Sequence, residues 1–479
     1  MKKINRFLLA MGLMCSIAVA EGQTVSPVDF MLMNPYQMKA NPATDLPYES
    51  VMSLVVGNIG VDVHNTTLRY DNLFEFDAQG RPATVNLRQF ANSLKTENYL
   101  GFDACWDLFT LYRRLNKGML TINYGIKAQG DASFNDGLFK LVAYGNGSFV
   151  GESHPADINM DLNLMAYREL AVGYQINVAD QLSLGGRAKL LFGLANVTTE
   201  AFEARLYTDA DSYALRLQEN IAMRAALPKA IYAENGSLMT NGPFSWGELY
   251  HNPGFGFDFA AEYHFNGPFS WVAAVQDWGV IFWRNNNISA TGKVNDAGQF
   301  YDNGDFLFNG LEVDQLQLIV SDDAYREQFM DTLQQYFQID LASFEKYNTA
   351  LNTNVLLRAN YDINTPDPYK AKHRFSAQAQ GRFMGIGFRP AFTVAYCGSF
   401  FQMLDVCASY TVMKDSYDNI GLGLAGNFGT FHIYLTTNNL IGCIKPMNAS
   451  GFNAQVGIVF NLRTSESDFD VNVTSEPLE

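Results

Sequence analysis

The segment Phe255–Phe265, with the sequence FGFDFAAEYHF, decides the fold class of this 479-residue chain because its residues alternate between two kinds. Phe, Tyr and Ala occupy the odd-numbered positions, and Gly, Asp, Ala, Glu and His occupy the even-numbered ones. Successive side chains of a β-strand point to opposite faces of the sheet. The segment is therefore predicted to be a strand with one apolar face and one polar face.

The same two-residue period runs through most of the chain, as residues 120–128 and 452–462 illustrate. It predicts fourteen strands, each bounded by turn-forming residues. We place these strands at residues 52–64, 99–112, 118–131, 162–178, 182–197, 254–266, 269–284, 353–363, 373–385, 388–398, 402–413, 418–427, 430–439 and 451–463.

The lengths of the connections indicate which kind of β-protein this is. The links after the even-numbered strands are short, whereas those after the first four odd-numbered strands cover residues 65–98, 132–161, 198–253 and 285–352. Outer-membrane barrels have short periplasmic turns and long extracellular loops. We therefore expect an all-β fold, an antiparallel transmembrane β-barrel over residues 52–463 whose apolar faces contact outer-membrane lipid.

One predicted strand does not alternate cleanly. Within residues 269–284, Trp271 and Trp283 share one parity and Trp278 has the other. This pattern predicts either a bulge near Gln276-Asp277 or a strand that is covered on both sides.

Two of the long loops contain predicted structure of their own. The polar residues Asp209–Ser212 are expected to turn a hairpin above the rim of the barrel. Ser321-Asp322-Asp323 can cap the start of a short helix that extends to about Tyr347.

The N-terminus has the pattern of a signal peptide over residues 1–20. Lys2, Lys3 and Arg6 precede an apolar stretch, and Ala18-Val19-Ala20 forms a small-x-small cleavage site. We expect an exported chain that begins at Glu21 and resides in the outer membrane of a Gram-negative cell. No later run of about 20 apolar residues predicts a helical membrane anchor.

The segments at the two ends of the mature chain differ in character. Residues 21–51 combine four prolines with Met31, Met33 and Met38, a composition too broken for a helix or strand yet apolar enough to be buried. Eight strands enclose an interior that their own side chains fill, so fourteen should leave space for residues 21–51 as a plug. Residues 464–479 form an acidic tail in the periplasm, either disordered or a partner-binding extension.

Composition excludes several functional classes. A hydrophobic content of 48% argues against disorder, and a formal charge of −16 without a basic face argues against a nucleic-acid partner. The six histidines have no zinc spacing, and the chain has neither a nucleophile elbow nor a phosphate-binding loop. We expect no enzyme activity, metal or cofactor. Cys397 and Cys407 could pair across a hairpin or remain buried thiols.

The polar faces of the predicted strands carry the candidate site residues. Charges inside a barrel tune its selectivity, so these side chains could line a route or bind a polar head group. Alternatively, they form an ion-paired or solvated lumen wall. The candidates are Lys127, Arg187, Lys189, Asp258, Glu262, His264, Arg358, Arg382 and Asp405.

Several stretches resemble a known family. They are Asn41-Pro42-Ala43, Tyr167–Tyr174 with the sequence YRELAVGY, Leu184–Gly193 with the sequence LGGRAKLLFG, Gly426–Gly429 with Tyr434, and Asn438–Leu440. Together they resemble a group of uncharacterised Gram-negative outer-membrane proteins that are distantly similar to the long-chain fatty-acid transporter family.

The resemblance implies a fourteen-stranded barrel with an N-terminal hatch in the lumen, and it implies that Asn41, Pro42 and Ala43 are the hatch motif. The residues themselves also fit a simple turn at the barrel entrance, because Asn-Pro disfavours helix. Two functional hypotheses follow. The first is passive transport of a hydrophobic or amphipathic small-molecule ligand. The second is a non-transporting structural or accessory barrel that docks a partner protein, whose identity the sequence does not give, through its large extracellular loops. A third reading, a soluble secreted β-rich binding protein, fits the apolar outward faces poorly.

Overall fold

The structure is a computed structural model, and it describes part of the chain. The described residues are 25–32, 34–46, 50–67, 69–77, 82–115, 118–228, 251–292, 301–302, 305–308, 339–343, 346–363, 372–401, 403–413, 416–445, 449 and 451–463. The predicted signal peptide and the acidic tail lie outside them.

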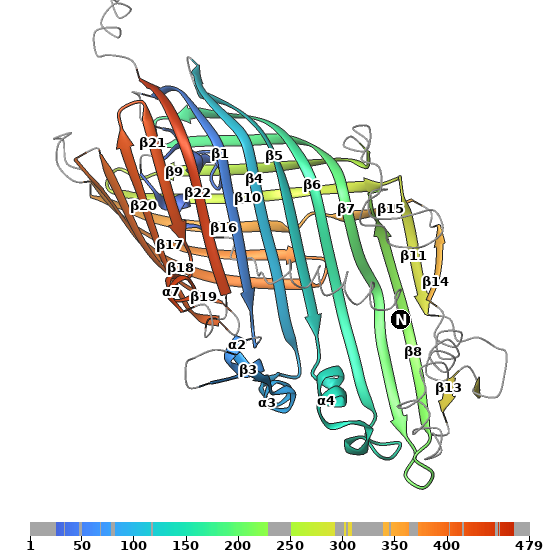
Figure 1. The fold of residues 1–479 in the computed structure, drawn as a ribbon. Coiled ribbons are helices and arrows are strands. Elements are labelled where there is room, and N and C mark those ends of the chain that lie inside the picture. The colour runs from blue at the N-terminus through green and yellow to red at the C-terminus, as the bar shows by residue number, and fades with distance from the viewer. Residues whose placement is uncertain are drawn as a thin grey trace, which may run out of the picture.

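Fourteen antiparallel strands form a closed barrel (Figure 1). The wall strands, in ring order, are β1 (Ser50–Asn65), β4 (Asn98–Leu115), β5 (Gly118–Phe134), β6 (Ala156–Ala179), β7 (Leu182–Thr208), β9 (Pro253–His264), β10 (Phe269–Trp283), β16 (Thr353–Ile363), β17 (Lys372–Met384), β18 (Gly387–Phe400), β19 (Leu404–Met413), β20 (Ser416–Phe428), β21 (Phe431–Thr437) and β22 (Gly451–Arg463). The ring closes because β1 pairs with β4 on one side and with β22 on the other. The predicted fold class and strand number are confirmed.

The long excursions gather at one rim, here called the outer rim, and the short turns gather at the opposite, inner rim (Figure 1). Strands β6 and β7 continue past the wall, where they pair with each other and β7 pairs with the excursion strand β8. The elements outside the wall are α2 (Tyr70–Leu73), β2 (Phe74–Phe76), β3 (Pro82–Val85), α3 (Leu87–Ser93), α4 (Gly137–Tyr144), η3 (Asn146–Ser148), β8 (Leu215–Ala226), β11 (Asn287–Gly292), β12 (Tyr301–Asp302), β13 (Asp305–Phe308), β14 (Ile339–Ser343), β15 (Tyr347–Ala350) and α7 (Leu440–Ile444).

The loop predictions have different outcomes. The hairpin at Asp209–Ser212 is confirmed, since β7 and β8 pair up to Thr208 and Leu215 and the Asp209 carboxylate accepts hydrogen bonds from Ser212. The helix expected up to about Tyr347 is wrong at its C-terminal end. Residues 339–343 form strand β14, because they pair with β11 and extend the outer-rim sheet. The stretch before them lies outside the described residues.

The outward face of the wall is apolar. Trp271, Leu357 and Leu435 expose 61%, 61% and 57% of their surface, whereas the inward positions between such residues are buried and mostly polar. Because a closed barrel leaves no unpaired strand edge, it can place such a surface in hydrocarbon. The protein is therefore an outer-membrane β-barrel. Among the described helices, none has both the length and the apolar character that a membrane crossing requires.

The irregular strand β10 contains the predicted bulge. Its register against β9 shifts between Val275 and Trp278, and Asp277 has a φ of 54°. The extra residue reverses the parity of the strand, so Trp278, like Trp271, points to the outside and Trp283 is fully buried. The bulge is confirmed, and it explains why the aromatic residues fall on both parities.

Of the two alternatives for Cys397 and Cys407, a disulfide or two buried thiols, the structure contains the disulfide. Cys397 and Cys407 are opposite each other on β18 and β19 and form a buried disulfide. Cys105 and Cys443 are free thiols.

Candidate functional site: the lumen and the N-terminal segment

Residues 25–32 and 34–46, here called the N-terminal segment, lie inside the barrel and form two short 3-10 helices. These are η1 (Pro27–Phe30) and η2 (Pro35–Lys39), and each begins with a proline preceded by a capping residue. The side chain of Ser26 accepts a hydrogen bond from the amide of Val28, and that of Asn34 accepts one from the amide of Tyr36. Proline fits the first helical position because no helical acceptor is available there for its missing N–H.

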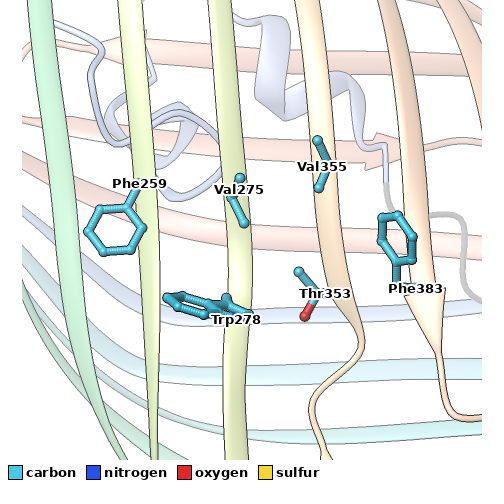
Figure 2. Close-up of a pocket in the computed structure, with 6 residues that line it drawn as sticks. All are labelled: Phe259, Val275, Trp278, Thr353, Val355 and Phe383. Atoms are coloured by element: carbon cyan, nitrogen blue, oxygen red, sulfur yellow. The ribbon is translucent and has the colours of Figure 1, made fainter.

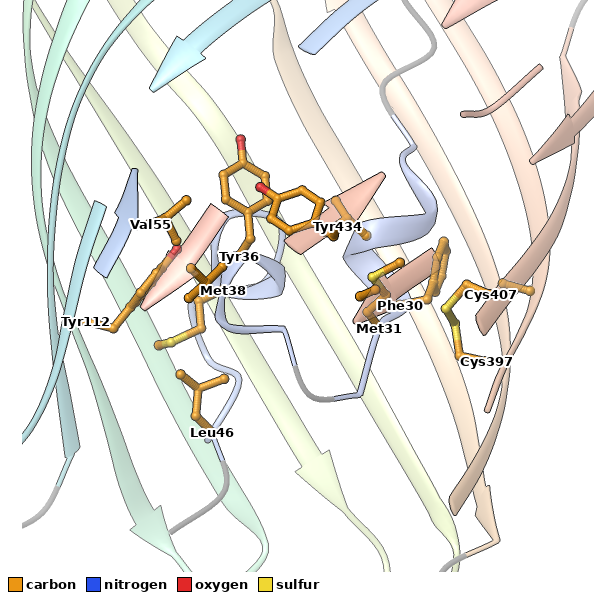
Figure 3. Packing of buried hydrophobic residues seen from close by; sticks show 14 of the residues in the cluster. Phe30, Met31, Tyr36, Met38, Leu46, Val55, Tyr112, Cys397, Cys407 and Tyr434 are labelled. Carbon is orange, nitrogen blue, oxygen red and sulfur yellow. A yellow bond between two sulfur atoms is a disulfide. The ribbon is translucent and has the colours of Figure 1, made fainter. Parts of the chain in front are cut away.

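Apolar side chains of the segment pack against the wall (Figure 3). Phe30 and Met31 lie beside the Cys397–Cys407 disulfide, and Met38 lies near Tyr112. The ring of Tyr36 approaches that of Tyr434, with 5.9 Å between centroids. The lumen is therefore filled at this level by the segment and the wall residues around it.

A group of polar residues attaches η2 to β1 and β4. The hydroxyl of Tyr36 donates to Asp107 Oδ2 at 2.7 Å, and Lys39 Nζ lies at the same distance from that oxygen. Asn58 Nδ2 donates to Asp107 Oδ2 at 2.9 Å, while its Oδ1 accepts from Tyr434 at 2.7 Å. Asn58 follows Gly57, which lies at a bulge in β1. The φ of Gly57 is 65°, a backbone conformation that residues with a side chain rarely adopt.

The Asn41-Pro42-Ala43 motif touches another part of the wall, at β7 and β9. Asn41 Nδ2 donates to Glu262 Oε2 at 2.7 Å, and Asn41 Oδ1 accepts from the amide of Ala43 at 3.1 Å. The backbone of Pro42 lies so close to Gly185 on β7 that a Cβ atom there would be 2.1 Å from the Pro42 oxygen. The motif thus forms a turn inside the lumen, where only a glycine on the wall leaves room for it.

The arginine Arg358 holds the beginning of the segment. Its Nη1 donates to the carbonyl of Asp29 at 2.8 Å, and its guanidinium lies 4.3 Å from the ring centroid of Phe30. Its Nε donates to Gln378 on the neighbouring strand. This one side chain therefore combines a hydrogen bond with a cation–π contact to the segment.

Six charged groups in the centre of the lumen form one continuous chain of ion pairs. Lys189 Nζ lies 2.7 Å from Asp258 and 2.6 Å from Asp277. Lys127 lies 2.9 Å from Glu169 and 3.0 Å from Asp277. Arg187 pairs with Asp258 at 2.7 Å. Three positive and three negative groups are present, so the network, which we call the central ion network, is formally neutral.

The bulge of β10 connects this network to the N-terminal segment. Asp277 faces the lysines of the network, and its amide donates to Asp258 at 2.7 Å. The adjacent Gln276 donates to the carbonyl of Ala40, and Arg187 donates to the carbonyl of Lys39. Removal of the segment would leave these two donors without their carbonyl partners.

An apolar cluster lies inside the barrel, on the side of the network that is nearer to the outer rim. Trp283 stacks on Tyr347 with 6.2 Å between ring centroids, and its indole N–H donates to Thr349 at 3.0 Å. The hydroxyl of Tyr347 donates to Asn196 at 2.8 Å. The other members of this outer apolar cluster are Met165, Tyr167, Leu191, Ala226, Ile281 and Leu351.

The remaining candidates also lie in the interior of the barrel. Arg382 pairs with Asp103. Asp405 is buried on β19, whereas His264 is partly exposed near the inner rim, 3.4 Å from Glu262. Of the predicted residues, Lys127, Arg187, Lys189 and Asp258 are brought together in one network.

Sequence reasoning missed several carboxylates of the lumen, among them Asp107, Glu169 and Asp277. The signal for Glu169 was available, because it shares the parity of Asn163 and Gln175 on β6. That for Asp277 was hidden by the bulge, which changes the parity of the strand at this residue.

The outer wall carries a shallow apolar groove of about 550 Å³ at the same bulge (Figure 2). It crosses β9, β10, β16 and β17 and faces away from the lumen. Phe259, Val275, Trp278, Thr353, Val355 and Phe383 line it. Since it lies on the apolar exterior, lipid chains are its natural surroundings.

Comparison with known proteins gives a family and a set of similar barrels. The chain matches the model of a family of unknown function, DUF5723, over residues 42–438. No curated protein matches it.

Solved structures similar to it include the toluene transporter TbuX of Ralstonia pickettii, with 9% identity, a TM-score of 0.38 and coverage of 94% of this chain and 98% of that one. The toluene transporter TodX of Pseudomonas putida has 7% identity, a TM-score of 0.38 and coverage of 92% and 97%. A FadL homologue of Pseudomonas aeruginosa has 10% identity, a TM-score of 0.33 and coverage of 85% and 88%.

Proposed function

We propose that this chain, which belongs to the DUF5723 family of unknown function, is a passive outer-membrane channel that admits hydrophobic or amphipathic small molecules past its N-terminal segment. In this proposal the segment is the hatch, and Asn41, Pro42 and Ala43 are the hatch motif, which is one of its contacts with the wall. The observation that carries the proposal is the way the segment is attached.

Side-chain contacts, not a strand ladder, hold the segment in the lumen. In the described part of the chain, every backbone-to-backbone hydrogen bond of residues 25–46 joins two residues of the segment itself. The wall is held by continuous ladders, so the segment can separate from it without the loss of any wall pairing. This difference supports a removable occupant of a permanent barrel.

The character of the inner wall supports an apolar or amphipathic solute. The lumen of a water-filled porin is polar. Most inward positions are polar here too, but Tyr112, Met119, Tyr167, Leu191 and Trp283 add buried apolar surface to the interior. Tyr167 and Leu191 are the next inward positions after Glu169 and Lys189 on their strands, so apolar and charged side chains adjoin there. A solute with both an apolar and a polar part matches such a lining better than an ion or a sugar does.

A disulfide lock tests the proposal. The hydroxyl oxygens of Ser26 in the segment and Thr436 on β21 are 3.1 Å apart. The Ser26→Cys/Thr436→Cys variant, with Cys105 and Cys443 replaced by Ala, can therefore tether the segment to the wall. We expect influx of a fluorescent amphipath into vesicles to fall to the protein-free rate when the lock is oxidised, and to return when it is reduced.

The control is the Ser26→Cys single variant, whose influx should not respond to reductant. Equal influx with the lock closed and open would contradict the role of the segment. Influx of the unlocked protein no faster than that of protein-free vesicles would contradict transport itself.

The second candidate is an accessory barrel that docks a partner protein. One observation favours it, namely the sheet that β7, β8, β11 and β14 extend beyond the wall at the outer rim. Removal of this sheet should abolish a docking function and leave solute influx unchanged, so the two functions can be separated.

A further inference from the structure

The strand order shows which parts of the wall face each other across the lumen. In the ring of fourteen, β4 is the second strand and β17 the ninth. Six strands lie between them in either direction, which is the largest separation that the ring permits. Residues of β4 and β17 that touch must therefore reach across the lumen.

Such contacts occur near the outer rim. The carboxylate of Asp103 on β4 pairs with both terminal nitrogens of Arg382 on β17. The hydroxyl oxygen of Tyr99, at the outer end of β4, lies 3.4 Å from Met384 Sδ. The Arg389 guanidinium on β18 lies 3.6 Å from the ring centroid of Tyr99.

The strands next to β4 and β17 also meet across the lumen. Asn352, just before β16, donates to Asp131 on β5 at 2.7 Å, and Asp131 also accepts from Tyr99. Gly385, in the turn after β17, approaches β6 so closely that a Cβ atom there would be 3.0 Å from Asn163 Nδ2. The turn between β17 and β18 thus meets the wall formed by β4, β5 and β6.

Four of these residues are buried, whereas the side chain of Asp103 is 24% exposed. Arg382 is 4% exposed, Asp131 1%, Asn352 1% and Tyr99 3%. The N-terminal segment takes no part in the contacts described above. Its wall contacts lie toward the inner rim and in the centre, at Asp107, Glu262 and Arg358 among others.

We propose that the cross-lumen contacts of Asp103, Asp131, Tyr99, Asn352, Arg382 and Arg389 form a second closure, in series with the N-terminal segment. The inference deepens the proposed function, because it assigns a second gate to the same lumen. Release of the segment alone then leaves the path closed, and the bidentate Asp103–Arg382 pair must separate before a solute can pass.

Ion conductance of the full-length protein in planar bilayers tests this arrangement. The segment variant is Tyr36→Ala/Lys39→Ala, which removes the contacts to Asp107. The closure variant is Arg382→Ala. The matched control is Arg374→Ala, since Arg374 is on the same strand and pairs with Asp362 on the neighbouring strand, not across the lumen.

We expect the segment variant and the closure variant to remain close to the wild-type conductance when tested singly. Their combination should conduct more than the sum of the two, and the combination with Arg374→Ala should not. Two closures in series predict this result, because each one blocks the current while it is intact.

Three outcomes would overturn the second closure. They are full conductance of the segment variant alone, no conductance of the combined variant, and equal conductance of the Arg374→Ala combination. If Arg382→Ala does not assemble, as shown by the loss of its heat-modifiable band on a gel, Asp103→Asn breaks the same pair from the other wall. The combined variant could conduct more than the sum of the two single variants while the wild-type protein shows no influx of the amphipath. That result would support the second closure and contradict the transport function.

Discussion

Lys189 Nζ lies 2.6 Å from Asp277 Oδ1, so a buried lysine on β7 is paired with the residue at which β10 bulges. The same carboxylate is 3.0 Å from Lys127 on β5. The bulge therefore does more than reverse the parity of a strand. It turns a carboxylate toward two lysines that would otherwise have fewer partners.

Loss of this carboxylate should destabilise the barrel. In Asp277→Ala, Lys127 and Lys189 keep Glu169 and Asp258 but lose their shared partner. Removal of one partner from a buried ion pair costs about 3 to 5 kcal/mol, so the free energy of unfolding in detergent should fall by that order. The control is Asp157→Ala, which removes the exposed pair with Arg205 and should cost less than about 1 kcal/mol. Equal effects would mean that the network is solvated.

The exterior gives a prediction about assembly. Phe257 on β9 and Val456 on β22 belong to the outward face of the wall. An arginine on the lipid face costs about 2 to 4 kcal/mol at the midplane of the bilayer, so Phe257→Arg and Val456→Arg should reduce the heat-modifiable, membrane-inserted form. Tyr213→Arg, at the exposed tip of the β7–β8 hairpin, should assemble normally. Normal assembly of the first two variants would show that the face is not in contact with lipid.

Removal of the disulfide should also destabilise the barrel. Cys397 and Cys407 are 10 residues apart in sequence, and a crosslink over so short a loop contributes about 3 kcal/mol in the chain-entropy model. Cys397→Ala/Cys407→Ala should lower the free energy of unfolding by that order. Treatment of the wild-type protein with reductant should give a similar loss, whereas the double variant should not respond to it.

The sequence predicts the wall well because neighbouring strands follow one another along the chain. Alternation, with the turn residues between segments, predicts all fourteen strands, and the aromatic residues on both parities of β10 predict a bulge as one of two alternatives. The helix expected up to Tyr347 is wrong at residues 339–343 because an open edge of β11 offers backbone partners there. The helix and strand propensities of residues 339–343 do not show that such partners are present.

The interior is harder to predict, since its contacts depend on the shape of the closed ring. The polar faces identify Arg187, Lys189 and Arg382 as inward residues. Nothing in the sequence indicates that Arg382 meets Asp103, because 279 residues separate them and no strand ladder connects their strands. The attachments of the N-terminal segment are equally hidden, as single side chains make them.

The contact between Gly185 and the Asn41-Pro42-Ala43 turn gives the sharpest prediction about the segment. A Cβ atom at residue 185 would be 2.1 Å from the Pro42 oxygen and 2.6 Å from the Ala43 amide nitrogen, distances at which the turn must move. The strand itself can keep its ladder with β6 and β9, so Gly185→Ala should assemble but carry a displaced segment. We expect faster proteolysis of the segment in the assembled barrel. The matched control is Gly256→Ala on β9, where a Cβ atom is no closer than 3.5 Å to any neighbour. Equal protease resistance of Gly185→Ala and Gly256→Ala would show that the turn does not depend on its contact with the wall, and that the segment is held by its other attachments at Asp107, Glu262 and Arg358.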